Sequence, residues 1–302
     1  MANRTLGIVG ASGFIGRELA RQAAAAGWRV CGFSRRARSP GDGIPAWRLW
    51  TGTPDFAGIG ALVNLAGEPI DQRWTAANKR RFHESRIGAT EILLRGVAKL
   101  PPGERPAVLV NGSAVGIYGE RGDTILEDDA AAGDGYLADL CKDWEAAADG
   151  VAALGPRVLK WRTGIVLGKG GEAFQKMLTP FKLGVGGRLG AGDQWMPWIH
   201  LEDLVGGMLH ALDHPAMEGP VNGSAPEPER NADFTRKLAK ALHRPALIPA
   251  PAFALKLLLG DFATAILASQ RATPRALLES GYRFRYPTLE LALRDLLGPG
   301  GS

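Results

Sequence analysis

The sequence predicts an α/β protein, in which a doubly wound parallel sheet is followed by a smaller C-terminal α+β lobe. Three observations predict this fold class. Apolar strand-like runs alternate with helical patterns as far as about residue 167. A turn with spaced glycines joins the first strand to the first helix. After residue 168 the alternation ends in a glycine-rich stretch. We therefore expect residues 1–167 to form a first domain and residues 168–302 a second lobe, with a helix at about 203–212 packing back on the first domain.

The chain opens with a strand, a glycine turn and a helix. The strand at residues 6–9 runs into Gly10-Ala11-Ser12-Gly13-Phe14-Ile15-Gly16, and the helix continues to about residue 26. Gly10 permits a tight turn, Gly13 lets the backbone approach a pyrophosphate, and Gly16 lets helix and strand pack closely. The phosphates would bind the free N–H groups at the helix N-terminus, beside Ser12, Phe14 and Ile15. The alternative is an ordinary glycine turn, but the flanking strand and helix favour a Rossmann dinucleotide-binding unit.

The end of the second strand, residues 29–33, indicates which dinucleotide binds. An NAD-selective site usually carries Asp or Glu here, to bind the ribose 2′-hydroxyl. This chain has Ser34 instead, followed by Arg35, Arg36 and Arg38. A guanidinium can form two charge-assisted hydrogen bonds with a 2′-phosphate, which a carboxylate would repel. The sequence therefore predicts NADP(H) as the cofactor. The alternative is that the arginines form a solvated turn.

The remaining elements follow in order. Strands are expected at residues 46–50, 61–67, 107–111 and 157–166, and helices at 75–99, 134–149, 203–212, 232–242, from 253 and at 289–297. Ligands of this fold class bind at the carboxyl ends of the parallel strands. Leu65, Ala66 and Gly67, at the end of one strand, are therefore expected to line the adenosine and the pyrophosphate. Residues 299–302 are expected to form a frayed tail.

Composition limits the partners and the compartment. The 302 residues carry a net charge of +5 without a run of Lys and Arg, so we expect no nucleic acid partner. Cys31 and Cys141 form no CxxC pair, and no cluster has metal-ligand spacing, so we expect a reducing, cytoplasmic compartment and no metal. Because the sequence enters its first strand at once, we expect no signal peptide. Lys256 and Asp261 interrupt the apolar stretch 253–268, which is too short to span a bilayer; we expect a buried or interface helix and no membrane partner.

Several ordered motifs run along the chain: Asn64-Leu65-Ala66-Gly67-Glu68-Pro69-Ile70, Ser85-Arg86, Lys142-Asp143-Trp144-Glu145, Arg162-Thr163-Gly164-Ile165-Val166-Leu167-Gly168 and Trp198-Ile199-His200-Leu201-Glu202-Asp203-Leu204. With the glycine turn, they make the chain resemble an atypical extended short-chain dehydrogenase/reductase, of the epimerase-family (NAD-dependent epimerase/dehydratase-like) subgroup that has its own C-terminal domain. The resemblance implies a set of NADP(H) contacts: Ser34 and Arg35 at the 2′-phosphate, Leu65 and Ala66 at the adenosine half, Arg86 at the cofactor, and Ile165 near the nicotinamide.

The catalytic residues depart from that superfamily's pattern. Its members carry Tyr-x-x-x-Lys on one helix face, where the lysine lowers the pKa of the tyrosine for proton transfer. Lys142 stands at the lysine position, but Ala138 lies four residues before it, and Tyr136 lies about 120° around the helix. We expect Lys142 to bind the cofactor ribose; the alternative is an exposed helix lysine. Ser113 is the candidate for orienting a carbonyl. Tyr118 could replace the missing acid if its loop folds toward Lys142; the alternative is a packed aromatic with a hydrogen-bonded hydroxyl.

Two further groups have a structural and a functional interpretation. His200 and Asp203 could form an acid–base pair, but we expect Asp203 to cap or charge a helix start and His200 to pack nearby. Trp195, Met196 and Trp198 could line a substrate cleft or pack in the core.

Two functions fit these observations. The first is an NADP(H)-dependent oxidoreductase or epimerase-like enzyme that acts on a small organic substrate, with Ser113, Tyr118 and Lys142 as candidate catalytic residues. The second is a non-enzymatic NADPH-binding regulator or sensor, which the absent tyrosine favours. A homodimer is possible in either case.

Overall fold

A seven-stranded parallel sheet forms the centre of the computed structural model, which describes residues 4–41 and 43–298. Every neighbouring pair of strands is parallel. The strands run in the order β3 (Ala46–Leu49), β2 (Arg29–Ser34), β1 (Thr5–Val9), β4 (Ala61–Asn64), β5 (Val108–Ala114), β7 (Arg157–Thr163) and β11 (Gly219–Gly223). The order reverses between β1 and β4, which is where ligands bind in open α/β sheets. The predicted doubly wound parallel sheet is therefore confirmed.

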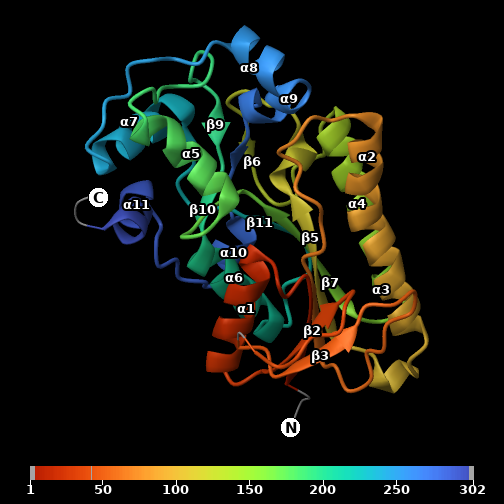
Figure 1. Ribbon diagram of the computed structural model, residues 1–302. Helices are drawn as coiled ribbons and strands as arrows, with labels where there is room; N and C mark the ends of the chain where they lie inside the picture. The colour runs from red at the N-terminus through yellow and green to blue at the C-terminus, as the bar shows by residue number, and fades with distance from the viewer. Residues whose placement is uncertain (1–3, 42, 299–302) are drawn as a thin grey trace.

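Helices cover both faces of this sheet (Figure 1). On one face, α1 (Phe14–Ala25), α6 (Leu201–Asp213) and α10 (Arg275–Glu279) bury Leu19, Met208 and Leu277 against the strands. On the other face, α3 (Ala89–Ala98) and α4 (Tyr136–Ala152) bury Leu93 and Ala148. Because α6 contacts α1 and the sheet, the second half of the chain contributes directly to the first domain.

A smaller C-terminal region has a hydrophobic core of its own. The helices α5 (Glu172–Lys182), α7 (Asn231–Ala241) and α11 (Leu289–Leu297) enclose Phe174, Leu178, Trp198, Phe234 and Leu293. Three short strand pairs accompany it: β8 (Ile165–Leu167) with β10 (Trp198–His200), β9 (Trp195–Met196) with β12 (Glu229–Arg230), and β6 (Ile125–Leu126) with β13 (Arg271–Ala272). The helices α8 (Ala252–Leu259) and α9 (Phe262–Leu267) lie at the upper edge of the molecule in Figure 1.

Several elements differ in detail from those expected. The helix expected at 75–99 is α2 (Ala76–His83) and α3, joined by the π-helical turn η1 (Glu84–Gly88), and short 3₁₀ turns form at η2 (Pro102–Glu104) and η3 (Val115–Tyr118). The strand expected at 157–166 breaks at Gly164, where a Cβ would lie 2.3 Å from the carbonyl oxygen of Pro197, and β8 then leaves the sheet to pair with β10.

The sequence analysis missed α5, which lies inside the glycine-rich stretch. The helix itself contains no glycine, and its buried Phe174, Leu178 and Phe181 recur at helical spacing. The edge strand β11 comes from beyond residue 167, so the sheet draws on both sides of the expected domain boundary. The tail expected at 299–302 lies outside the described residues. Among the described residues, the structure contains no helix that is both long and apolar enough to cross a membrane.

Candidate functional site

The glycine loop connects β1 to α1 at the reversal of strand order. Gly10 has a φ of +81°, and a Cβ there would lie 2.9 Å from the carbonyl oxygen of Leu65. A Cβ at Gly16 would lie 2.2 Å from the carbonyl oxygen of Gly10. Gly13 is the N-cap of α1 and offers no capping side chain, and the first turn of α1 contains no acidic residue. The first N–H groups of α1 are therefore free to bind an anion.

A basic pocket of about 180 Å³ lies beside this loop, and it is lined by Ser12, Arg17, Arg38, Ile44 and Trp47. Arg17 Nη1 donates a hydrogen bond to the carbonyl oxygen of Ser12 at 2.8 Å. Arg38 Nε donates to Ser34 Oγ at 3.2 Å, and its guanidinium lies over the Trp47 ring at 5.1 Å. Neither guanidinium has a carboxylate partner within the described parts of the chain. Both are therefore held in place with donors left for an anionic ligand.

Of the arginines that follow Ser34, Arg38 lines this pocket, and Arg17 joins it from α1. Arg35 and Arg36 are exposed and do not line the pocket, although the backbone N–H of Arg36 donates to Ser34 Oγ at 3.3 Å. Arg17 lies in the helix after the glycines, so the spacing of the second strand and its basic turn does not point to it. Helical side chains point back toward the N-terminus, which brings this guanidinium to the loop. An arginine in the first turn of that helix was the available signal.

The turn after β4 lies against the glycine loop. Leu65 and Ala66 are half-buried, and Gly67 is exposed. A Cβ at Gly67 would lie 3.2 Å from the guanidinium carbon of Arg86, which the π-helical turn η1 presents. The Arg86 guanidinium also lies over the ring of Trp144 at 5.2 Å. Burial lowers the pKa of Arg86, and no carboxylate pairs with it among the described residues. This cation is therefore available to an anionic ligand at the carboxyl edge of the sheet. The π-helical turn that carries it is a feature often found at functional sites.

The other residues expected near the cofactor connect the loop to the second lobe. The Phe14 ring packs so closely on Gly168 and Gly171 that a Cβ at either glycine would lie 2.6 or 2.8 Å from it. Ile15 packs against the core of the sheet. Ile165 is half-buried at the start of β8 and pairs with Trp198.

Ser113 lies at the end of β5, where it was expected, but its hydroxyl is already bound. Ser113 Oγ donates to Glu145 Oε1 at 2.7 Å. Glu145 also accepts from Arg162 Nε at 2.8 Å and from Arg162 Nη2 at 2.9 Å. All three residues are buried. A serine held this way has its proton directed at a carboxylate, so orienting a carbonyl would require it to rotate.

Tyr118 is fully buried in the 3₁₀ turn η3. Its hydroxyl donates to Asn222 Oδ1 at 2.7 Å and accepts from Arg162 Nη1 at 3.0 Å. Burial raises the pKa of Tyr118. These contacts match the alternative interpretation of Tyr118 as a packed aromatic with a satisfied hydroxyl, and its loop does not turn toward Lys142.

Lys142 does not join Ser113 and Tyr118. Its side chain is 42% exposed and its ammonium group lies 2.8 Å from Asp139 Oδ1, a contact that raises the pKa of Lys142. Lys142 is therefore an exposed helix lysine, as in the alternative interpretation. The residues of α4 that face Ser113 are Glu145, which accepts its hydrogen bond, and Cys141, whose pKa burial raises to about 12. The three expected catalytic residues are therefore not assembled into one triad.

His200 and Asp203 act in the structure as anchors. His200 is the N-cap of α6, and its Nδ1 accepts from the N–H of Glu202 at 3.1 Å. Burial lowers the pKa of His200, whose Nε2 lies 3.4 Å from Asp295 Oδ2 without hydrogen-bond alignment. Asp203 was expected to cap or charge this helix start: the cap is His200, but Asp203 does lie in the acidic first turn of α6, where its carboxylate accepts the backbone N–H groups of Arg285 and Tyr286 at 2.7 and 2.8 Å.

The three residues considered for a substrate cleft have separate positions. Met196 and Trp198 are buried in the core of the C-terminal region. Trp195 is half-buried, and the guanidinium groups of Arg230 and Arg271 lie 4.7 and 4.5 Å from its ring. Core packing therefore describes Met196 and Trp198, and only Trp195 reaches the surface.

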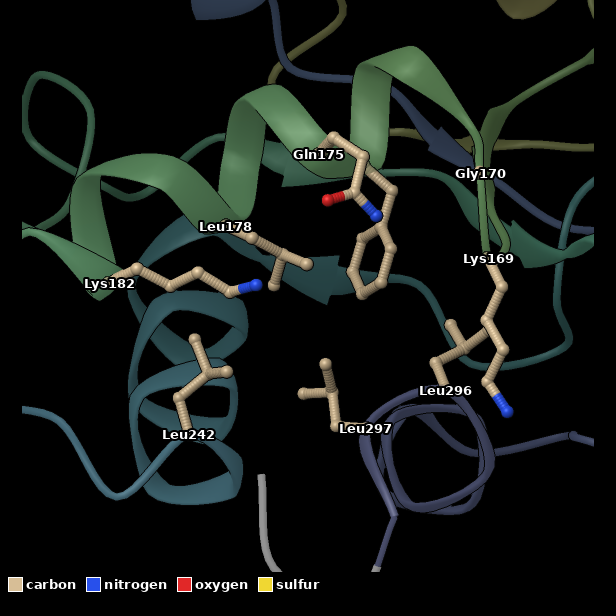
Figure 2. Close-up of a pocket in the computed structure, with 9 residues that line it drawn as sticks. Lys169, Gly170, Gln175, Leu178, Lys182, Leu242, Leu296 and Leu297 are labelled. Atoms are coloured by element: carbon tan, nitrogen blue, oxygen red, sulfur yellow. The ribbon is translucent and has the colours of Figure 1, made fainter. Parts of the chain in front are cut away.

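A second cavity, of about 290 Å³, lies between α5, the end of α7 and α11 (Figure 2). Phe174, Leu178, Leu242, Leu296 and Leu297 contribute apolar walls, and Lys169 and Lys182 stand at its sides. It belongs to the core of the C-terminal region and shares no lining residue with the basic pocket. No group of three or more His, Cys, Asp or Glu residues in the described chain is placed to hold a metal ion.

Comparison with known proteins gives the family. Residues 6–222 match the model of the "NAD dependent epimerase/dehydratase family", and residues 250–296 match a "Domain of unknown function (DUF1731)". A protein of Arabidopsis thaliana named "Epimerase family protein SDR39U1 homolog, chloroplastic" is 36% identical over 308 residues, covering 97% of this chain and 86% of its own length. "Epimerase family protein MT2273" of Mycobacterium tuberculosis is 39% identical over 298 residues and 97% of each chain.

A solved structure extends the match to three dimensions. The crystal structure of human epimerase family protein SDR39U1 (isoform2) with NADPH is 34% identical, superposes with a TM-score of 0.87, and covers 97% of this chain and 98% of the human chain. The matched family model covers most of the chain, and relatives above 30% identity span nearly all of it. The chain therefore belongs to the NAD-dependent epimerase/dehydratase family, as an SDR39U1-like epimerase family protein with a C-terminal DUF1731 domain.

Proposed function

We propose that this protein binds NADP(H) across the glycine loop and uses it as an oxidoreductase or epimerase-like enzyme on a small organic substrate. One observation carries the cofactor assignment: the basic pocket beside the loop holds Arg17 and Arg38 without a carboxylate partner among the described residues. A ribose 2′-phosphate is the group of NADP(H) that NAD(H) lacks, and paired guanidiniums suit it. The human relative solved with NADPH supports the same assignment.

The residues of the loop fit the rest of the dinucleotide. A Cβ at Gly10 or Gly16 would enter backbone atoms, so these glycines keep the turn tight and the start of α1 open for the pyrophosphate. Leu65 and Ala66 would contact the adenosine half, and the Arg86 guanidinium would add positive charge along the same edge. When bound, NADP(H) would exchange a hydride at its nicotinamide ring.

The chain's own acid–base groups limit which reaction follows. Ser113 and Tyr118 would take part only after releasing their present partners, Glu145 and Asn222. Lys142 would reach a ribose only after leaving Asp139. The enzyme proposal therefore requires that substrate or cofactor displaces at least one of these contacts.

The occupied hydroxyls of Ser113 and Tyr118 also favour a second candidate function, a non-enzymatic NADPH-binding regulator or sensor. In that case the buried contacts of Ser113 and Tyr118 persist in the bound state, and the protein responds to the ratio of the reduced and oxidised cofactor. A cytoplasmic compartment remains part of the proposal for both functions, and the buried, unpaired thiols of Cys31 and Cys141 are compatible with a reducing one.

Calorimetry of the nucleotide-free protein with NADPH and NADH tests the cofactor assignment. We expect NADPH to bind at least tenfold more tightly, since each charge-assisted bond contributes about 1.5–3 kcal/mol. Equal affinities, or no binding, would refute it. A screen of carbonyl compounds and nucleotide sugars for NADPH oxidation then separates the two functions. Turnover supports the enzyme, and tight binding without turnover of any compound supports the sensor.

A further inference from the structure

Exposed apolar side chains gather on one surface of this protein. Among the described residues, eleven large apolar side chains are exposed, and seven of them come from two short stretches of chain. We call these seven the α8 surface: Leu183, Val185, Leu247, Ile248, Phe253, Leu257 and Leu258. Leu257 is 80% exposed and Phe253 is 75% exposed, four residues apart on one face of α8. Scattered exposed leucines are ordinary, but a concentration of this kind marks an interaction site.

The two stretches form one continuous surface. The N–H of Ile248 donates to the carbonyl oxygen of Gly186 at 3.3 Å, and the N–H of Ala250 donates to that of Arg188 at 2.9 Å. A bridge between Leu189 and Ala250 continues the pairing up to the start of α8. Figure 1 shows α8 at the edge of the molecule, and none of its eight residues is buried. Only Ala254, Leu255 and Leu259 of α8 are half-buried, so the helix covers little apolar surface, and contact with another apolar phase would stabilise it.

Within the two stretches that carry the α8 surface, every charged side chain is a cation, and Asp193 and Asp261 follow directly after them. Residues 182–192 and 243–260 contain Lys182, Arg188, Arg244 and Lys256 but no Asp or Glu. All four side chains are exposed, and none has an ion-pair partner in the described parts of the chain. Other exposed cations, such as Lys176 and Arg275, pair with neighbouring carboxylates, whereas Arg17 and Arg38 at the basic pocket are unpaired among the described residues as well.

We infer that the α8 surface docks the protein onto an anionic lipid bilayer, with Phe253, Leu257 and Leu258 entering the interface between headgroups and acyl chains. Apolar side chains flanked by unpaired Lys and Arg are the combination that binds such an interface. A helix of eight residues is about 12 Å long, so α8 would lie in the interface and could not span it. The expectation of no membrane partner rested on spanning length, which surface docking does not need.

Charge argues for lipid over a second copy of this chain. A symmetric dimer through the α8 surface would bring its unpaired cations against the same cations, with no carboxylate of these stretches to neutralise them. An anionic bilayer supplies the opposite charge over the whole surface. Each lysine or arginine near such a bilayer strengthens binding about fivefold.

Co-sedimentation of the full chain with vesicles tests the inference. We expect binding to vesicles of phosphatidylcholine with phosphatidylglycerol, and binding at least tenfold weaker to pure phosphatidylcholine. The double variant Phe253→Ser/Leu257→Ser should lose binding to both. The matched control is Leu49→Ser/Leu278→Ser, which removes two leucines that are 52% and 49% exposed elsewhere, and it should bind as the wild type does. Circular dichroism and thermal unfolding verify that each variant is folded.

The charge variant Arg244→Gln/Lys256→Gln keeps the test valid if the serine variant misfolds. It should weaken binding to the anionic vesicles about twentyfold or more and leave NADPH affinity unchanged, whereas Lys99→Gln at the exposed end of α3 should bind like the wild type. Absence of binding to anionic vesicles would overturn the inference. So would light scattering that shows a dimer which Phe253→Ser/Leu257→Ser dissociates, because a second copy would then be the occupant.

Discussion

Replacing Arg38 with alanine tests whether the basic pocket selects the cofactor. The Arg38 guanidinium is positioned from two sides, by Ser34 Oγ at 3.2 Å and by the Trp47 ring at 5.1 Å. Among the described residues, no carboxylate accepts a hydrogen bond from it. Its bonds to a 2′-phosphate would each contribute about 1.5–3 kcal/mol. Arg38→Ala should therefore raise the Kd for NADPH about 10- to 150-fold. The Kd for NADH should change less than about threefold, because that ligand has no 2′-phosphate.

The assay is isothermal calorimetry of each variant with NADPH and NADH at one salt concentration. Arg38→Lys keeps the charge but loses the planar fork and the stacking on Trp47, so it should lie between the wild type and Arg38→Ala. Arg35→Ala is the matched control, since Arg35 is exposed and lines no pocket. If Arg35→Ala weakened NADPH as much as Arg38→Ala, or if Arg38→Ala weakened both nucleotides equally, the assignment of the 2′-phosphate to this pocket would be wrong.

Three further predictions concern buried groups. Glu145→Ala leaves the buried Arg162 guanidinium without its carboxylate partner and should lower the free energy of unfolding in urea by about 3–5 kcal/mol. Asp149→Ala, which breaks the more exposed pair with Lys160, should lower it by less than about 1 kcal/mol. Equal losses would contradict the buried pairing. Burial raises the pKa of Cys141 to about 12, so iodoacetamide should modify it at about pH 8 only in denaturant, and mass spectrometry of the native protein should show it unmodified. Burial lowers the pKa of His200, so the unfolded state binds the extra proton, and stability should fall as the pH drops below about 6.5. His200→Asn keeps a capping acceptor but does not titrate, so its free energy of unfolding should fall less than that of the wild type between about pH 7.5 and 5.5. An equal fall in both proteins would mean that another group causes the pH dependence.

The fold was largely predictable because its signals are local and repeated. The glycine loop, the alternating strands and the final helix at 289–297 follow from spacing and periodicity, and the final helix matches α11 in both bounds. The errors arose where tertiary contacts override local signals. One strand ends at Gly164, where a side chain would collide with the backbone of Pro197. The glycines around α5, together with Pro180 inside it, concealed the helical spacing of its buried residues.

The candidate site was predictable at its backbone and less so at its side chains. The positions of Gly10 and Leu65 follow from a motif, and their contact in the structure agrees with it. Which arginine lines the basic pocket depends on how a turn and a helix bring distant side chains together, so spacing alone favoured Arg35 over Arg17. The motif spacing along α4 pointed to Lys142. In the structure the preceding residue, Cys141, is on the helix face toward Ser113, and Lys142, about 100° further around the helix, lies in solvent.

The carboxylate of Asp203 has a consequence for how the two parts of the molecule move. It sits on α6, against the sheet, and holds the backbone of Arg285 and Tyr286 just before α11. The chain thus passes between the sheet and the C-terminal region five times: at β8, before α6, after β11, before α10 and again at this carboxylate. Hinge closure needs a single flexible connection between two parts, whereas here five connections would have to bend together. We therefore expect the cofactor to bind without a slow closing step, at an association rate set by diffusion and charge.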